Sequence, residues 1–153
     1  MTQRVVCAVD NSPAADHVVA HAAEIADRLG LDLTLLHVAQ DGPHASGNRA
    51  AVERGRRGAW EAAQELFYRL RVDNGLGREA PGEVLFGSPV DQLERISKEP
   101  DVALIVVGSR GHGALRAAMT GSVSHSLTSR ASCPVTVVPP TASERIVGTS
   151  TVA

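Results

Sequence analysis

Residues 102–107 form an unbroken run, Val-Ala-Leu-Ile-Val-Val, that glycine follows at once, and this junction constrains the fold more than any other stretch. A strand buried on both faces of a parallel sheet reads as such a continuous run, whereas a half-exposed strand alternates. Glycine past its carboxyl end lets the backbone approach a ligand that a Cβ atom would exclude. A second pair, Gly121-Ser122, stands where a new helix is expected, and the free N–H groups of a helix start suit phosphate. The segment therefore predicts a strand, a glycine-rich turn and a phosphate site.

Four more short apolar segments alternate with helical patterns along the chain. We expect strands at 4–9, 32–38, 82–87, 102–107 and 135–138, and helices over 13–29, 48–72, 122–131 and from 89 up to Pro100. This alternation predicts an α/β fold with a five-stranded parallel sheet and helices on both faces. Right-handed crossovers favour a doubly wound, Rossmann-like sheet, for which we expect the order 3-2-1-4-5. Ligands bind such sheets where the winding reverses, which would bring Asp10 beside Gly108.

Local signals predict where the helices begin and which residues they bury. Ser12 before Pro13 is typical of an N-cap followed by proline at the first helical position. Ser88-Pro89 repeats this signal, and Asp91 three residues after Ser88 resembles a capping box. Helical spacing predicts two buried stripes, one of Val18, Ala22, Ile25, Ala26 and Leu29, and one of Trp60, Ala63, Leu66, Phe67 and Leu70.

Length and composition narrow the possible functions. With 153 residues, 43% of them hydrophobic, we expect one domain over 1–140 and a C-terminal tail over 141–153. The formal net charge of -2 and the 3% of aromatic residues argue against a nucleic-acid partner. No apolar run has the length of a membrane span or a signal-peptide core, so we expect a cytoplasmic protein without membrane contact.

Cysteine and histidine spacings indicate no metal site. Cys7 and Cys133 lie in apolar surroundings without a C-x-x-C pattern, so we interpret them as buried hydrophobic residues. His17 and His21 are one helical turn apart, but no third ligand accompanies them, and we interpret them as a surface pair. His37 ends a buried strand, where a core or rim residue is expected rather than a catalyst.

The common nucleotide motifs are excluded by spacing. A P-loop needs a lysine after its second glycine, but Lys98, the only lysine, precedes the strand at 102–107. A dinucleotide fingerprint needs G-x-G-x-x-G after the first strand, where this chain has Asp10-Asn11-Ser12-Pro13. A phosphate would therefore be held by a hydroxyl group and backbone amides, without a lysine.

The spacing Gly108-x2-Gly111-x9-Gly121-Ser122 resembles the nucleotide-binding motif of the universal stress protein family. The resemblance covers about residues 3–139, through segments 5–12, 35–38, 105–111 and 133–138. It implies a five-stranded α/β fold that binds ATP with a divalent cation, which we expect to be Mg²⁺. It also implies a homodimer through the last strand, and an apolar edge at Val135–Val138 would need such a cover.

The resemblance also implies a site. Asp10 and the backbone around Val38 are expected at adenine and ribose, with Asn11 and Ser12 alongside. Ribose and phosphates are expected against the turn residues Gly108, Ser109, Arg110, Gly111, His112 and Gly113, and against the helix start at Gly121, Ser122 and Val123. Plainer roles stay open: Asp10 as a turn former, Ser122 as an N-cap, and Arg110 as a solvated charge.

No spacing of nucleophile and base, and no paired carboxylates, indicates catalysis. The sequence favours a nucleotide-binding regulatory protein of the stress response, in which ATP would alter contacts within a homodimer or with an unidentified protein partner. Two alternatives stay open. One is a slow ATP hydrolase or phosphoryl-transfer enzyme that uses the same site, and the other is an interaction module that binds no nucleotide.

Overall fold

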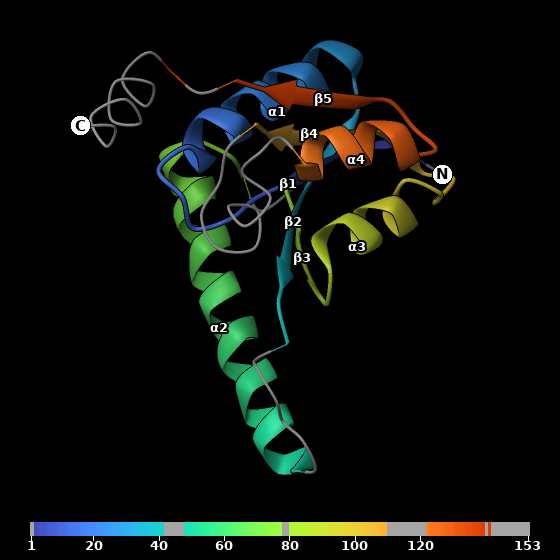
Figure 1. The fold of residues 1–153 in the computed structure, drawn as a ribbon. Helices are drawn as coiled ribbons and strands as arrows, with labels where there is room; N and C mark the ends of the chain where they lie inside the picture. The colour runs from blue at the N-terminus through green and yellow to red at the C-terminus, as the bar shows by residue number, and fades with distance from the viewer. Residues whose placement is uncertain (1, 42–47, 78–79, 110–121, 140, 142–153) are drawn as a thin grey trace, which may run out of the picture.

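Five parallel strands form a single sheet in the order β3-β2-β1-β4-β5 (Figure 1). The computed structural model describes residues 2–41, 48–77, 80–109, 122–139 and 141. The strands are β1 (Arg4–Ala8), β2 (Asp32–Ala39), β3 (Gly82–Phe86), β4 (Val102–Gly108) and β5 (Val135–Val138). The predicted five-stranded sheet and its order are confirmed. The expected tail, apart from Thr141, lies outside the described residues.

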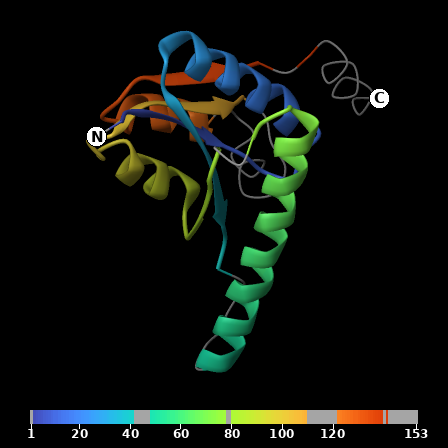
Figure 2. The ribbon, with the colours of Figure 1, turned by 180° about the vertical axis from the view of Figure 1, so that it is seen from behind.

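Two pairs of helices cover the two faces of the sheet (Figures 1 and 2). The helices are α1 (Ala15–Leu29), α2 (Arg49–Asp73), α3 (Pro89–Ile96) and α4 (Ser122–Arg130). One core lies between the sheet and the α1–α2 pair, and the other lies between the sheet and the α3–α4 pair. None of the helices in the described ranges is both long and apolar enough to cross a bilayer.

The central strand β1 supplies side chains to both cores. Val5 and Cys7 belong to the core under α1 and α2, whereas Val6 and Ala8 belong to the core under α3 and α4. All four side chains are buried. Because successive side chains of a strand point to opposite faces, a strand covered on both faces must be apolar throughout. This is why its sequence is a continuous run.

Of the two predicted serine caps, the one at Ser12 is wrong, and the one at Ser88 is confirmed in position but not in its hydrogen bond. Helix α1 begins at Ala15, two residues later than expected, and its N-cap position, Ala14, makes no side-chain hydrogen bond. The Asp10 carboxylate accepts the Ser12 N–H at 3.0 Å, so a tight turn within the loop replaces the cap. Ser88 is the N-cap residue of α3 and Pro89 is its first residue, as expected, but the Ser88 side chain makes no capping hydrogen bond. Asp91 instead accepts a hydrogen bond from Arg130 of α4 at 2.8 Å.

The buried stripe of α2 is confirmed at four of its five predicted positions, but Trp60 is 51% exposed. The buried residues lie within 63–70, where α2 packs on the sheet, and Trp60 precedes them. The first half of α2 extends past the sheet, as Figure 1 shows, and the buried residues of α2 all lie in its second half. Leu29, also predicted to be buried, is 58% exposed in the last turn of α1.

A cluster of ion pairs around Arg4 connects distant parts of the chain at the edge of the sheet where the strands begin. Arg4 at the start of β1 donates to Glu83 of β3 at 2.6 Å, to Glu99 at 2.8 Å and to Asp101 at 2.9 Å. Its side chain is only 13% exposed. Burial disfavours its charged form, but the hydrogen bond and the charges of the three carboxylates outweigh that cost and raise the pKa of Arg4. The opposite, carboxyl edge is the one at which a ligand is expected.

Candidate functional site

The winding of the chain reverses between β1 and β4, which are hydrogen-bonded neighbours. From β1 the chain proceeds to β2 and β3 on one side, and then returns to β4 and β5 on the other. In the register Cys7 lies opposite Val106, so the loops after β1 and β4 leave the same edge side by side. Such a switch point opens a crevice where parallel α/β sheets bind ligands. Asp10 and Ser109 follow these two strand ends.

The loop after β1 is fixed by backbone contacts as well as by the Asp10–Ser12 turn. The Val9 N–H donates to the Leu36 carbonyl at 2.8 Å, which extends the pairing of β1 with β2. Ser12 is buried, whereas Asn11 is exposed and Asp10 is half-buried. Because the loop turns back on the Asp10 carboxylate, these three predicted site residues are held in one short, rigid turn.

The end of β2 contributes two consecutive residues that face opposite sides of the sheet. The His37 imidazole Nδ1 lies 2.9 Å from the Val9 carbonyl oxygen on the α2 side. The Val38 side chain packs against the core under α3 and α4. A carbonyl can only accept, so His37 carries a proton on Nδ1, and its role as a rim residue is confirmed. The backbone at Val38 lies near the β1 end, because β1 and β2 are adjacent.

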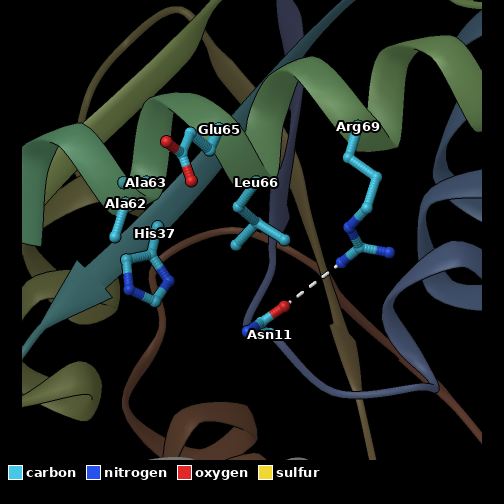
Figure 3. A pocket seen from close by; sticks show the side chains of 7 residues that line it. All are labelled: Asn11, His37, Ala62, Ala63, Glu65, Leu66 and Arg69. Carbon is cyan, nitrogen blue, oxygen red and sulfur yellow. Dashed lines mark hydrogen bonds between the residues drawn. The ribbon is translucent and has the colours of Figure 1, made fainter.

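A hollow of about 290 Å³ opens between α2 and the ends of β1 and β2. Arg69 of α2 reaches across it and donates from Nη2 to Asn11 Oδ1 at 3.3 Å (Figure 3). Its Nη1 lies 3.6 Å from Asp16 Oδ2. The side chains that line the hollow are Asn11, His37, Ala62, Ala63, Glu65, Leu66 and Arg69. Of these, only Asn11 is a predicted site residue.

Sequence reasoning missed the contribution of α2 to this edge. Arg69 lies 58 positions from Asn11, and its spacing on the helix is that of an ordinary surface charge. One signal in the sequence could have revealed it, namely the long helical pattern that follows the second strand. A helix at that point in the chain must pack beside the ends of β1 and β2. Its polar residues next to the buried stripe then border the loop after β1.

On the β4 side, part of the predicted wall is described. Gly108 and Ser109 are half-buried, and the Ser109 N–H donates to the Val138 carbonyl of β5 at 2.9 Å. This hydrogen bond therefore extends the pairing of β4 with β5 to Ser109. Helix α4 begins at Ser122, as expected, and Val123 is half-buried in its first turn. The remaining predicted residues, Arg110, Gly111, His112, Gly113 and Gly121, lie outside the described residues.

The two cysteines and the histidines of α1 are not among the residues that line this hollow. Burial raises the pKa of the Cys7 thiol to about 12, so Cys7 is a core residue and not a nucleophile. Cys133 is half-buried rather than fully buried as expected, and both thiols are free. The His17 and His21 rings pack edge to face, with centroids 4.5 Å apart. Among the described residues no cluster of three potential metal ligands occurs.

Comparison with protein-family models identifies one family. The model of the Universal stress protein family matches residues 1–139. A universal stress protein of Mycobacterium tuberculosis is 34% identical over 145 residues, which cover 88% of this chain and 47% of the relative. One of Bacillus subtilis is 46% identical over 52 residues, 34% of this chain and 35% of the relative. The chain spans about half the length of the mycobacterial relatives it matches.

Solved structures with the same fold carry similar names. The universal stress protein UspA from Lactobacillus plantarum aligns with a TM-score of 0.72 and 25% identity, over 90% of this chain and 97% of that one. A universal stress protein in complex with cAMP aligns with a TM-score of 0.65 and 24% identity, over 92% and 99%. One from Archaeoglobus fulgidus in complex with dAMP aligns with 0.58 and 24%, over 88% and 96%.

Proposed function

This chain belongs to the universal stress protein family, and from that membership we propose that it binds ATP together with Mg²⁺ at the carboxyl edge of its sheet. The bound nucleotide regulates the protein by altering contacts within a homodimer or with a protein partner. In this proposal the protein is a binder rather than an enzyme.

The adjacency of β1 and β4 at the winding reversal is the observation that carries the proposal. The glycine spacing of the family motif begins at Gly108, at the end of β4, and the described part of the motif resumes at the start of α4. A phosphate at that helix start would meet free N–H groups and the positive end of the helix dipole. Two proteins of this fold are named as complexes with adenine nucleotides, cAMP and dAMP, which supports the class of ligand.

The predicted site residues could hold a nucleotide whose own phosphates bind the metal ion, without a separate set of protein ligands for the metal. Asp10 and the backbone at Val38 would contact ribose and adenine, and residues 108–113 and 121–123 would enclose the phosphates. Mg²⁺ retains several waters and is usually held by phosphate oxygens with one or two carboxylates. The phosphates of ATP would therefore supply most of its ligands, and no protein metal ligand is assigned.

The outer edge of β5 supports the homodimer. Among the strands that the structure describes, β5 pairs only with β4, and Val137 is 36% exposed. An exposed apolar edge strand is a template for pairing, and a two-fold axis pairs it with its own copy. Val137→Lys is expected to give monomers of 16.0 kDa in sedimentation equilibrium. Thr128→Lys, an exposed position on α4, is the matched control. A dimer that persists in Val137→Lys would exclude this interface.

Equilibrium dialysis against radiolabelled ATP and Mg²⁺ tests the nucleotide. The proposal predicts one ATP retained per chain and recovered intact after denaturation. Steady, metal-dependent release of phosphate would instead indicate a slow hydrolase. Failure to retain ATP under any metal condition would contradict the proposal and favour an interaction module that binds no nucleotide.

A further inference from the structure

The outer face of α2 carries Tyr68 and Val72, large hydrophobic side chains that the described part of the chain leaves uncovered, and Trp60 lies on the same helix about 100° around from this face. Tyr68 is 70% exposed, Val72 is 60% exposed and Trp60 is 51% exposed. These are three of the five large hydrophobic side chains found exposed among the described residues. Aromatic residues gathered on one surface element are typical of interaction surfaces.

Seven positions form one continuous ridge along this face. They recur at intervals of three and four residues, so they lie on one side of the helix. The buried residues Ala63, Leu66 and Leu70 lie on the opposite side. The ridge consists of Ala50, Arg54, Arg57, Glu61, Glu65, Tyr68 and Val72, all of them exposed.

The charges on this ridge are divided between its two halves. Arg54 and Arg57 lie in the first half, and Glu61 and Glu65 lie in the second. No ion pair joins any of these four side chains to another described residue, although Arg56 in the same helix pairs with Asp41 at 2.8 Å. The ridge therefore presents a basic pair and an acidic pair that lack partners within the described chain.

From this arrangement we propose that α2 of one copy docks antiparallel against α2 of a second copy. The two-fold axis crosses the ridge at the level of Ala59 and Trp60 along the helix, so the basic pair of each helix lies against the acidic pair of the other. Tyr68 and Val72 then pack over the first turns of the partner helix. A helix of 25 residues is about 37 Å long, and its first half extends past the sheet where a second helix can approach it (Figures 1 and 2). This interface is separate from the β5 edge and needs no nucleotide.

The test uses the Val137→Lys chain, so that pairing through β5 does not obscure the result. One helix pair forms a small interface, so a concentration-dependent equilibrium between monomer and dimer is expected in sedimentation experiments. A protein that stays monomeric across the soluble concentration range would overturn the proposal.

Charge exchange separates docking from misfolding. Arg54→Glu with Arg57→Glu makes the ridge acidic, and Glu61→Arg with Glu65→Arg makes it basic. Each double variant alone should associate at least roughly tenfold more weakly than the chain with the native ridge, because like charges then face each other across the axis. An equimolar mixture should restore a dimer with one copy of each. If the mixture associates no better than its components, the antiparallel pairing is wrong. If Val137→Lys fails to fold, the two double variants are made and mixed in the chain that keeps Val137, and the same comparison tests the antiparallel pairing.

Discussion

The His37 imidazole Nδ1 donates to the Val9 carbonyl oxygen at 2.9 Å and ties the end of β2 to the end of β1. The contact lies directly before the loop that carries Asp10, so it fixes the position from which that loop departs. Its geometry also sets the tautomer, because the carbonyl oxygen can only accept. Nε2 is therefore the nitrogen that remains for a ligand or solvent.

His37→Leu is expected to lower the free energy of unfolding by about 1 kcal/mol, since the carbonyl of the buried residue Val9 loses its side-chain donor. The same variant should bind ATP more weakly, because the loop after β1 is less well fixed. Urea denaturation and calorimetric titration measure the two effects. His21→Leu, at an exposed position, should match the native protein in both. Equal unfolding midpoints for His37→Leu and native protein would contradict this role.

Gly82→Ala is expected to destabilise the protein by about 1–3 kcal/mol, because a Cβ atom at Gly82 would collide with the buried Phe67 ring. Gly58→Ala provides the contrast. Gly58 lies inside α2 with no atom near its Cβ position, so alanine should stabilise that helix by about 0.5–1 kcal/mol. Thermal and urea unfolding of the two variants should move in opposite directions. A neutral Gly82→Ala would show that Phe67 can move away.

Glu94→Gln should have an effect that depends on pH. Hydrogen bonds from Lys98 and Arg130 lower the pKa of Glu94. A carboxylate whose pKa is lowered on folding stabilises the protein above its ordinary pKa, and that contribution is lost as pH falls through the lowered value. Native protein should therefore exceed the variant in urea midpoint at pH 7, and the difference should shrink toward pH 3. Glu61→Gln is the control. A difference independent of pH would argue against the ion pair between α3 and α4.

The two thiols should react at different rates with a disulfide reagent at pH 8. Cys133 is half-buried and is expected to react in the native protein. Cys7 is fully buried with its pKa raised to about 12, so it should react only on unfolding. Cys133→Ser should remove the native-state reaction altogether. Rapid reaction of both thiols without denaturant would show that the β1 region opens readily.

The sheet could be predicted because each strand is a short apolar run and strands alternate with helical patterns. The position of Asp10 beside the β4 end followed from the predicted order alone. The predicted cap at Ser12 was wrong, because the Asp10 carboxylate accepts the Ser12 N–H and forms a turn that the cap signal does not reveal. The helical spacing of α2 predicted that Trp60 is buried, but spacing alone does not show where along the helix the contact with the sheet ends.

The contacts that build the α2 side of the site join residues far apart in the sequence. His37 and Val9 are 28 positions apart, and Arg69 and Asn11 are 58 positions apart. Neither pair has a local signature, so only the packing of α2 against the strand ends reveals it. The glycine turn at 110–113 and Gly121 remain predictions from the motif.

Isothermal titration with ATP and Mg²⁺ tests the central claim most directly. Native protein and Gly58→Ala should bind one ATP per chain with the same affinity. Gly121→Val should lose measurable binding while keeping its native circular dichroism spectrum, because the added side chain would occupy the expected phosphate position. Unchanged affinity in a folded Gly121→Val protein, or no heat of binding in the native protein, would contradict the account.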